Sequence, residues 1–491
     1  MNRRRFLAKG LSFTPVLISP ACGEKTDQAT SAPPFDFSTS RGMNMIDLCG
    51  PAWYPPEKFL ENEFKLLADQ GFNHVRLLVD SFYFTSKDQP HKFDTVRAEK
   101  IDHGIALARK HGLHATLAFF AVPGFSVHQQ NQSPSLWDDP GLQKTFASFW
   151  EIFAKRYREI PPAELSFNLL NESPWNLSAE KYTALMRLAL DAIRATSKDR
   201  PVIIDGLKAG REPLKSFLSE PHLIQSAHFY EPFELTHYQA DWLSDSARYP
   251  TAKVWPLPRI PHHLFGRKQE HHSPLTLKGD FSSCSELTLH LGEVLLSEKR
   301  PLTLSLTGIE TSSIALTPQA SWKKENEIPE HDLIQYWADT IVTLPVPKND
   351  GTLNLRVTTG DRLNFRNLTL GNHCLMPSSR EWCPQPSPLN FSPSEGFKTV
   401  NFYDKNWIKS ELARTWKPCL EVGQPVVVQE FGCNHLLPHD TAISYLRDCR
   451  AAFEELNLGW TYYSNTGTLG VLRSPRKNGS LDPALLKVLS K

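Results

Sequence analysis

Hydrophobic and polar residues follow two spacings along most of the chain. Short apolar or β-branched runs alternate with longer stretches in which apolar residues recur at helical spacing, as in Phe146, Phe149, Trp150 and Phe153. From about residue 36 this order is typical of a parallel α/β fold. The predicted strands are residues 42–47, 74–80, 114–120, 164–172, 201–206, 224–230, 425–432 and 459–464. The predicted helices are residues 58–70, 96–111, 142–158, 179–197, 213–219, 404–421 and 441–456.

The interval 245–399 breaks this rhythm. It is rich in Pro and His, and apolar and polar residues alternate at 287–291, 302–306 and 353–357 and less regularly at 340–344. Such alternation with turn residues between the runs predicts an antiparallel β-sandwich. Without it, roughly 300 residues remain after the leader, which suits one barrel. We therefore predict an α/β fold, a (β/α)₈ TIM barrel built from residues 36–244 and 400–491, with the sandwich inserted in a barrel loop.

The first 35 residues are predicted to be an export signal and linker. Arg3, Arg4 and Arg5 open a basic region that precedes a short, mildly apolar run, which matches the twin-arginine pattern. The expected location is therefore periplasmic or extracellular; the alternative is a basic, disordered N-terminus. Cys22 is a candidate for a lipid anchor, although the residues before it match the usual lipobox poorly.

Charge and composition narrow the class of partner. The formal net charge is +1, from 54 basic and 53 acidic residues, so no overall field favours nucleic acid or an anionic membrane. No later stretch approaches the roughly 20 apolar residues of a membrane span. The 12 Trp, 12 Tyr and 28 Phe supply aromatic faces that stack on sugars or fill cores. The cysteines show neither CxxC pairs nor zinc-ligand spacing, so we predict no metal and no cofactor.

Two glutamates occupy the positions where a barrel places its chemistry. Glu172 closes the fourth predicted strand and Glu430 closes the seventh, and the C-terminal ends of barrel strands carry the active site. A single charged residue there is commonly a solvated strand end. A pair is more informative, because retaining glycosidases use two carboxyl groups about 5 to 5.5 Å apart. Strands four and seven face each other across such a barrel, so we predict Glu172 and Glu430 to be the catalytic pair.

Four further polar residues fall on the predicted strands around the two glutamates: Arg76 on the second, Asn171 on the fourth, and His228 and Tyr230 on the sixth. Arg76 is a candidate for holding the nucleophile ionised, and Asn171 for binding a sugar 2-hydroxyl. His228 and Tyr230 are candidates for orienting the carboxylates. Each residue also has a purely structural interpretation. Arg76 would be an interior ion-pair partner and Asn171 a turn residue. His228 would be a core histidine and Tyr230 a packed aromatic residue. Their joint placement on three strands favours the functional interpretation.

The predicted barrel resembles glycoside hydrolase family five, the cellulase-like enzymes, over nearly all of residues 40–244 and 400–491. The matching segments are residues 41–44, 73–76, 167–172, 228–233 with 236–237, 428–432 and 459–460. The resemblance implies Glu172 as acid/base and Glu430 as nucleophile, with Arg76, Asn171, His228 and Tyr230 supporting them. It also adds Trp460 and Tyr463, on and after the eighth strand, to the predicted substrate-binding residues.

Three positions depart from the family pattern. Ser173 stands where members usually have proline after the acid/base, and Phe120 where they often have a histidine after strand three. Tyr463 replaces the tryptophan that commonly forms the floor of the sugar site. Both carboxyl groups are retained, so the changes bear on which substrate is used and how fast.

The sequence favours a retaining hydrolase of a β-linked glucan or related β-glycan. A glycan-binding protein that has lost turnover is one alternative, although the two retained glutamates argue against it. A transglycosylase is another, because it uses the same covalent intermediate with a different acceptor. The insert shows no clear aromatic row, which favours a structural or cleft-shaping role over carbohydrate binding.

Overall fold

The computed structural model describes residues 34–49, 58–86, 88–129, 132–243, 253–266, 274–378 and 388–490. Residues 1–33, which include Cys22 and nearly all of the predicted export signal and linker, lie outside these ranges. The contacts separate Met1–Pro33 from Pro34–Lys491, and all of the described residues belong to the second unit. Within the described ranges, no helix combines the length and apolar character needed to cross a bilayer.

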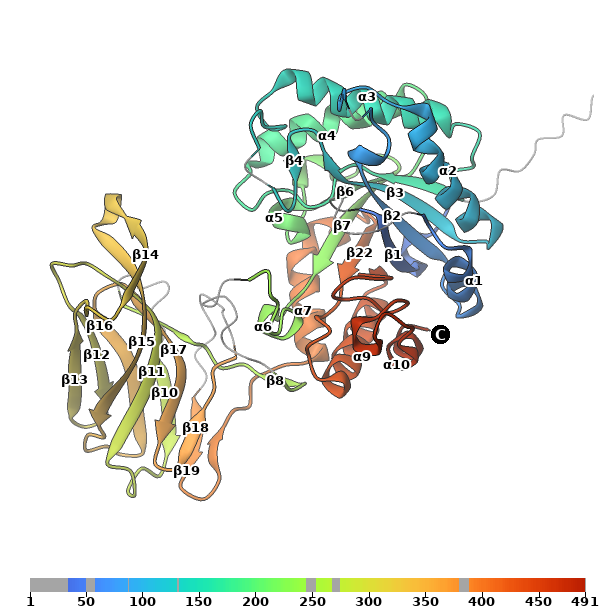
Figure 1. Cartoon of the computed structure of the whole chain (residues 1–491). Coiled ribbons are helices and arrows are strands. Elements are labelled where there is room, and N and C mark those ends of the chain that lie inside the picture. The colour runs from blue at the N-terminus through green and yellow to red at the C-terminus, as the bar shows by residue number, and fades with distance from the viewer. Residues whose placement is uncertain are drawn as a thin grey trace, which may run out of the picture. The chain divides into compact units, whose positions relative to one another are not determined.

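A closed barrel of parallel strands forms the first part of the fold (Figure 1). Hydrogen bonding follows the order β2-β1-β23-β22-β7-β6-β5-β3, and pairing of β2 with β3 closes the ring. A short strand, β4 (Phe125–Ser126), pairs antiparallel with the end of β3. The fold class predicted from the sequence is confirmed. The barrel strands are β1 (Arg41–Leu48), β2 (His74–Asp80), β3 (His114–Val122), β5 (Leu165–Asn168), β6 (Val202–Asp205), β7 (Leu223–Phe229), β22 (Val426–Phe431) and β23 (Gly459–Tyr462).

Helices connect the strands and cover the outside of the barrel (Figure 1). Several begin at a capping side chain, such as Asp94, Asp139 and Ser178, which accepts a hydrogen bond from a backbone N–H of the first turn. The helices are α1 (Glu61–Asp69), α2 (Thr95–Lys110), α3 (Pro140–Arg156), α4 (Ala179–Arg194), α5 (Leu207–Gly210), α6 (Phe233–Thr236), α7 (Lys405–Thr415), α8 (Lys417–Glu421), α9 (His439–Glu455) and α10 (Pro483–Leu489).

Two predicted helices were wrong in detail. The stretch 213–219 forms only a 3₁₀ turn, Lys215–Phe217, because Leu218 takes an extended backbone and Ser219 a left-handed one with φ 62°. The stretch 404–421 is divided at Trp416 into α7 and α8. Pro418 explains the break, because proline lacks the N–H that a continuous helix would require there.

Polar side chains fill the interior of the barrel at the N-terminal ends of its strands. His74 contacts Ser40 Oγ at 2.8 Å and Thr116 Oγ1 at 2.7 Å, and Thr116 contacts Ser166 Oγ at 2.7 Å. His114 contacts the same Ser166 hydroxyl at 2.9 Å. Burial lowers the pKa of His114 to about 3 and that of His74 well below its usual value, so both rings stay neutral. This network occupies the N-terminal end of the barrel, which leaves the C-terminal ends of the strands for a site.

Packing of helices on the barrel gives a direct test of the core. Leu190 on α4 is fully buried, whereas Leu188 on the same helix is 45% exposed. We expect Leu190→Ala to lower the free energy of unfolding by about 2 to 5 kcal/mol, because the truncation leaves a cavity. Leu188→Ala is the matched control and should change it by less than about 0.5 kcal/mol. Denaturant unfolding followed by circular dichroism measures both, and equal effects would contradict the packing.

The interrupting segment forms two sheets over a core of its own. One sheet has the order β13-β12-β16-β10-β19-β20 and the other the order β14-β15-β11-β17-β18, with β9 added to β17. Leucines from both sheets share one cluster of buried residues, as a sandwich requires. The strands are β9 (His263–Phe265), β10 (Leu275–Gly279), β11 (Glu286–Leu296), β12 (Leu302–Thr307), β13 (Thr311–Leu316), β14 (Lys323–Ile328), β15 (Leu333–Pro345), β16 (Thr352–Thr359), β17 (Arg362–Leu370), β18 (His373–Leu375), β19 (Leu389–Ser392) and β20 (Gly396–Lys398).

The sandwich departs from the antiparallel prediction at one pair of strands, because β10 and β19 run parallel. All four alternating runs predicted from the sequence lie on its strands. Where the chain leaves and re-enters the barrel, β8 (Leu257–Pro258) pairs antiparallel with β21 (Phe402–Tyr403). The predicted boundaries at residues 245 and 399 stay a prediction.

Candidate active site

Strand β22, which carries Glu430, and strand β5, which precedes Glu172, are separated by β7 and β6 in the barrel, and the two glutamates are positioned differently. Glu430 is the penultimate residue of β22. The expectation that Glu172 closes a strand was wrong, because β5 ends four residues earlier at Asn168. Glu172 instead has a left-handed backbone with φ 49°, and its N–H donates to Asp205 Oδ2 at 3.0 Å. This turn positions the Glu172 side chain over the strand ends.

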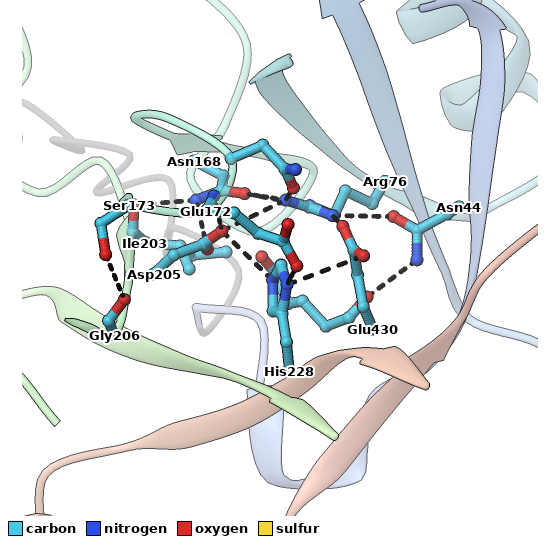
Figure 2. Close-up of polar contacts among 12 residues, drawn as sticks. Asn44, Arg76, Asn168, Glu172, Ser173, Ile203, Asp205, Gly206, His228 and Glu430 are labelled. Atoms are coloured by element: carbon cyan, nitrogen blue, oxygen red, sulfur yellow. Dashed lines mark hydrogen bonds and ion pairs between the residues drawn. The ribbon is translucent and has the colours of Figure 1, made fainter. Parts of the chain in front are cut away.

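The two carboxylates share one site. One oxygen of Glu172, one of Glu430 and a ring nitrogen of His228 all lie within 4.8 Å of one another (Figure 2). The Glu430 side chain is 5% exposed and that of Glu172 is 18% exposed. Glu430 is thus more deeply buried than Glu172.

Glu430 is held by one cation and one hydroxyl. Arg76 Nη1 donates to Glu430 Oε1 at 2.7 Å, and the Tyr230 hydroxyl donates to Oε2 at 3.0 Å. Burial raises the pKa of Glu430 above its usual value, and the charges of His228 and Arg76 oppose that rise. Burial also raises the pKa of Tyr230 well above its usual value, so that this hydroxyl remains a donor. Both carboxylate oxygens are therefore fixed in position.

Arg76 is fully buried and is itself held by three asparagines. Its guanidinium donates to Asn44 Oδ1 at 3.0 Å and to Asn168 Oδ1 at 2.9 and 2.7 Å (Figure 2). It also donates to Asn171 Oδ1 at 2.7 Å. Neutral amides satisfy these donors without cancelling the charge, which acts on Glu430 at 2.7 Å and on the buried Asp205 at 3.7 Å. Because the planar Arg76 guanidinium is fixed by these hydrogen bonds, it determines the position of Glu430 Oε1.

His228 stands between three carboxyl groups. Its Nδ1 is 2.9 Å from Glu172 Oε1 and 3.6 Å from Glu430 Oε2, and its Nε2 is 3.1 Å from Asp205 Oδ2. Burial alone would lower the pKa of His228, but Glu430, Asp205 and Glu172 raise it to about 10. Burial would likewise raise the pKa of Asp205, but His228 and Arg76 hold it below its usual range. The histidine is therefore a buried cation among acids.

Protonation of His228 predicts a pH dependence of stability. Its folded pKa of about 10 exceeds the unfolded value of about 6.5, so the stabilisation is complete below pH 6.5 and is lost as the pH rises toward 10. We expect the free energy of unfolding to fall by about 2 to 4 kcal/mol over that interval. His228→Gln should flatten this decline, whereas His103→Gln, on the exposed side of α2, should preserve it. A wild-type decline retained in His228→Gln would contradict the assignment.

Two predicted substrate-binding residues have different outcomes. Trp460 was wrongly predicted: it is fully buried in the outer core, packed edge-on against Phe72 and Phe431, and does not face the site. Tyr463 is partly exposed and packs against an apolar cluster that contains Cys49 and Phe120. Glu430 is among the charges acting on the Tyr463 hydroxyl, whose pKa burial raises well above its usual value. Tyr463 therefore lies near the carboxylates, whereas Trp460 does not.

Sequence reasoning missed three residues of this network: Asn44 on β1, Asn168 on β5 and Asp205 at the end of β6. All three are fully buried. Asp205 carried the same signal that identified the glutamates, an acidic side chain at a strand end. Asn44 and Asn168 were polar interruptions of apolar runs, a signal that could have found them.

The cluster of Glu172, His228 and Glu430 also has spacing that could suit a metal ion. Its ligand atoms are already engaged: His228 Nδ1 contacts Glu172 Oε1, and Glu430 accepts from Arg76 and Tyr230. A cation would meet the charges of Arg76 and of protonated His228. The chemistry of this donor set therefore fits a pair of carboxyl groups better than a metal centre.

Comparison with known proteins agrees with the barrel. The family model of cellulase, glycosyl hydrolase family 5, matches residues 28–255. Endoglucanase C of Acetivibrio thermocellus is 29% identical over 200 residues, which are 40% of this chain and 57% of that protein. Cellodextrinase A of Ruminococcus flavefaciens is 28% identical over 188 residues, 38% of this chain and 55% of that protein. The chain thus spans somewhat more than half the length of these curated relatives.

Solved structures show the same fold. The crystal structure of a glycoside hydrolase aligns with TM-score 0.58 and 19% identity over 92% of this chain and 98% of that chain. Endoglucanase Cel5A from Thermotoga maritima aligns with TM-score 0.53 and 17% identity over the same shares. The resemblance expected from the motifs is confirmed, and residues 28–255 carry the cellulase signature of glycosyl hydrolase family 5.

Proposed function

We propose that this chain is a retaining β-glycoside hydrolase that acts on a β-linked glucan or a related β-glycan through a covalent glycosyl-enzyme intermediate. The observation that carries the proposal is the approach of Glu172 and Glu430 to within 4.8 Å in one site. Retaining glycosidases place their carboxyl groups about 5 to 5.5 Å apart, whereas inverting enzymes leave about 6.5 to 9.5 Å for a water molecule. The short separation favours attack by a carboxylate on the sugar.

Glu430 is the proposed nucleophile. Its ion pair with Arg76 and the hydrogen bond from Tyr230 favour the ionised form and aim it, because both contacts strengthen with negative charge. In the first step an oxygen of Glu430 bonds to the anomeric carbon while the bond from that carbon to the leaving oxygen breaks. Formation of this ester bond removes the negative charge of the Glu430 carboxylate.

Glu172 is the proposed acid/base. It is more exposed than Glu430, which suits exchange of a proton with the leaving group and then with water. The local charges support this role: three carboxyl groups face Arg76 and protonated His228, so the cluster is neutral when Glu172 carries its proton. In the first step Glu172 gives this proton to the leaving oxygen. In the second it takes one from the water that attacks the anomeric carbon, which releases Glu430.

Two further residues are proposed to contact the sugar. Asn171 accepts from Arg76 with its carbonyl oxygen, and its amide nitrogen has no partner within the described ranges, so it can donate to a sugar hydroxyl. The partly exposed ring of Tyr463 offers a flat face near the carboxylates. Relatives named endoglucanase and cellodextrinase make a β-glucan the first substrate to test.

Product analysis tests the proposal. Soluble β-glucan, β-mannan and aryl β-glycosides are incubated with the purified protein, and the anomeric configuration of the first product is followed by proton NMR. Initial release of the β-anomer supports retention, and initial release of the α-anomer would refute it. Binding without turnover would favour the non-catalytic alternative, and formation of longer oligosaccharides would favour transglycosylation.

Trapping of the intermediate tests the role of Glu430 separately. A 2-deoxy-2-fluoro β-glucoside with a good leaving group should add one fluorosugar to the protein, because fluorine slows both steps and the good leaving group accelerates only the formation of the ester. Peptide mass spectrometry should place the label on Glu430. A stoichiometric label on another carboxyl group would exclude Glu430 as nucleophile without excluding glycosidase activity.

A further inference from the structure

Asp205 is an acidic side chain at the end of a barrel strand, but it is closed off from solvent. It is the last residue of β6, and its side chain is fully buried. The carboxyl groups of Glu172 and Glu430, in contrast, both keep some exposure. Asp205 is therefore not placed to touch a sugar, and any part that it has in the reaction acts through another residue.

One oxygen of Asp205 holds the backbone of Glu172. Asp205 Oδ2 accepts from the Glu172 N–H at 3.0 Å. Glu172 lies beyond the end of β5, so this N–H has no partner in the ladder of strands. Its φ of 49° is a left-handed conformation that residues with a side chain rarely adopt. Because the carboxylate supplies the missing acceptor, Asp205 stabilises the turn that orients the Glu172 side chain.

The same oxygen lies against the imidazole ring of His228. Asp205 Oδ2 is 3.1 Å from Nε2 of this ring, and the other ring nitrogen, Nδ1, is 2.9 Å from Glu172 Oε1 (Figure 2). Gly210 packs against the ring, because a Cβ atom built on this glycine would lie only 2.8 Å from His228 Cγ. Asp205 therefore acts on Glu172 twice, directly at the backbone and through His228 at the carboxyl group.

Asp205 is itself held in place and ionised. Asn168 Nδ2 donates to Asp205 Oδ1 at 3.0 Å, and the Tyr182 hydroxyl donates to the Asp205 carbonyl oxygen at 2.9 Å. Burial by itself would raise the pKa of Asp205, but the charges of His228 and Arg76 hold it below its usual range. The Asp205 carboxylate is thus a fixed anion behind the His228 ring.

This anion helps to keep both protons on His228. Burial would lower the pKa of His228, but the three acidic groups that face the ring, Glu430, Asp205 and Glu172, raise it to about 10. A ring with both protons donates from Nδ1, so Glu172 Oε1 is held as an acceptor. A carboxyl group that accepts with one oxygen in this way carries its own proton on the other oxygen, which in Glu172 is Oε2.

We propose that Asp205 is a positioning residue that orients Glu172, through its backbone N–H and through His228, so that Oε2 carries the proton given to the leaving oxygen. This inference rests on the function proposed for the barrel and names the group that directs its acid. The proton passes from Oε2 to the leaving oxygen as the bond to the anomeric carbon breaks, and Glu430 supplies the electron pair for the new bond. His228 and Asp205 keep their protons and charges throughout.

Asp205→Asn tests the proposal, because it removes the charge with almost no change of volume. It should lower kcat/KM about 10 to 100-fold for the polysaccharide that the natural sequence hydrolyses, since the acid is no longer aimed. For a dinitrophenyl β-glycoside, whose departure needs no proton, kcat/KM should stay within about twofold. The loss on the polysaccharide should grow as the pH rises, because without the Asp205 charge the pKa of His228 falls. The ratio of the two substrates and the shape of the pH profile do not depend on the folded fraction.

Asp482→Asn is the matched control. Asp482 is also fully buried, with Oδ2 3.1 Å from His439 Nε2, and asparagine caps a helix about as well as aspartate. This change should leave the substrate ratio and the pH profile as they are in the natural sequence. In the Glu172→Ala background, Asp205→Asn should have no further effect beyond about twofold on either substrate, because the residue through which it acts is gone.

Equal losses of Asp205→Asn on both substrates would indicate a structural effect and would overturn the proposal. A substrate ratio and pH profile equal to those of the natural sequence would overturn it as well, as would a full loss in the Glu172→Ala background. His228→Gln, which removes the link, should show the same preference for the better leaving group. An inactive or inverting natural sequence would refute the proposed function too, whereas retaining turnover with an unaffected Asp205→Asn protein would refute this inference alone.

Discussion

Replacing Glu430 by alanine is expected to lower kcat/KM for β-glycosides by about 10⁴-fold or more. The change removes the carboxylate that would form the covalent intermediate, and the fully buried Arg76 charge loses its partner at 2.7 Å. What activity remains would come from substrate positioning and from Glu172. Initial rates on an aryl β-glycoside measure the effect, with active protein checked by its unfolding transition.

Chemical rescue separates loss of a nucleophile from loss of structure. Azide is small enough to enter the space left by the Glu430 side chain and can attack the anomeric carbon from the same side. We expect azide to accelerate Glu430→Ala and to give an α-glycosyl azide, because one displacement inverts the configuration. Glu212→Ala, which removes a partly exposed carboxylate paired with Lys208, should keep full activity and show no rescue. A fully active Glu430→Ala protein would refute the assignment.

Replacing Glu172 by alanine is expected to have an effect that depends on the leaving group. For substrates whose leaving group needs a proton, kcat should fall by about 10² to 10⁴-fold, the usual contribution of a positioned acid. For a dinitrophenyl glycoside, departure needs no proton and formation of the intermediate should be nearly unaffected. The intermediate should then accumulate, because the base for the second step is also missing.

A burst of dinitrophenol, followed by a slow steady rate, would report this accumulation in stopped-flow measurements. Added azide should raise the steady rate and give a β-glycosyl azide, since the second displacement restores the original configuration. The opposite azide anomers expected from the Glu172 and Glu430 variants distinguish the two roles in one experiment. Equal losses on both leaving groups, without a burst, would show that Glu172 does not act as the acid.

The position of His228 links these roles. It touches Glu172 and approaches Glu430, so its charge acts on both carboxyl groups. A cation there favours the ionised form of Glu430, the proposed nucleophile. The same contacts explain why the folded protein is expected to lose stability when His228 loses its proton at high pH.

Much of the fold could be predicted from spacing alone. Each of the eight predicted strands corresponds to a strand of the barrel, because apolar runs flanked by amphipathic helices leave few alternatives to a parallel sheet covered on its outside. Glu172, Glu430, Arg76, His228 and Tyr230 could be selected because polar side chains within or at the end of such apolar runs are unusual. The strands of the sandwich could be predicted from the alternation of apolar and polar residues along them.

Which side of a barrel strand faces the site could not be predicted in the same way. Residues Gly459 to Tyr462 of β23 are all buried, so burial does not distinguish the interior from the helix-covered exterior. Trp460 therefore looked as suitable as Tyr463, and the structure places Trp460 outside. The turn at Glu172 was hidden for a related reason, because the apolar residues Leu169 and Leu170 continue the pattern of the strand beyond its end at Asn168.

The sequence by itself determined the elements and the kinds of chemical group that end them, since both depend on residues close together in the chain. Only the tertiary structure decided which of these groups meet. Arg76 and Glu430 are 354 positions apart and come to 2.7 Å. Asp339 and Arg366 meet because two bulges change the register of their strands. Such contacts depend on closure and register, which are set by the packing of the whole sheet and leave no local pattern in the sequence.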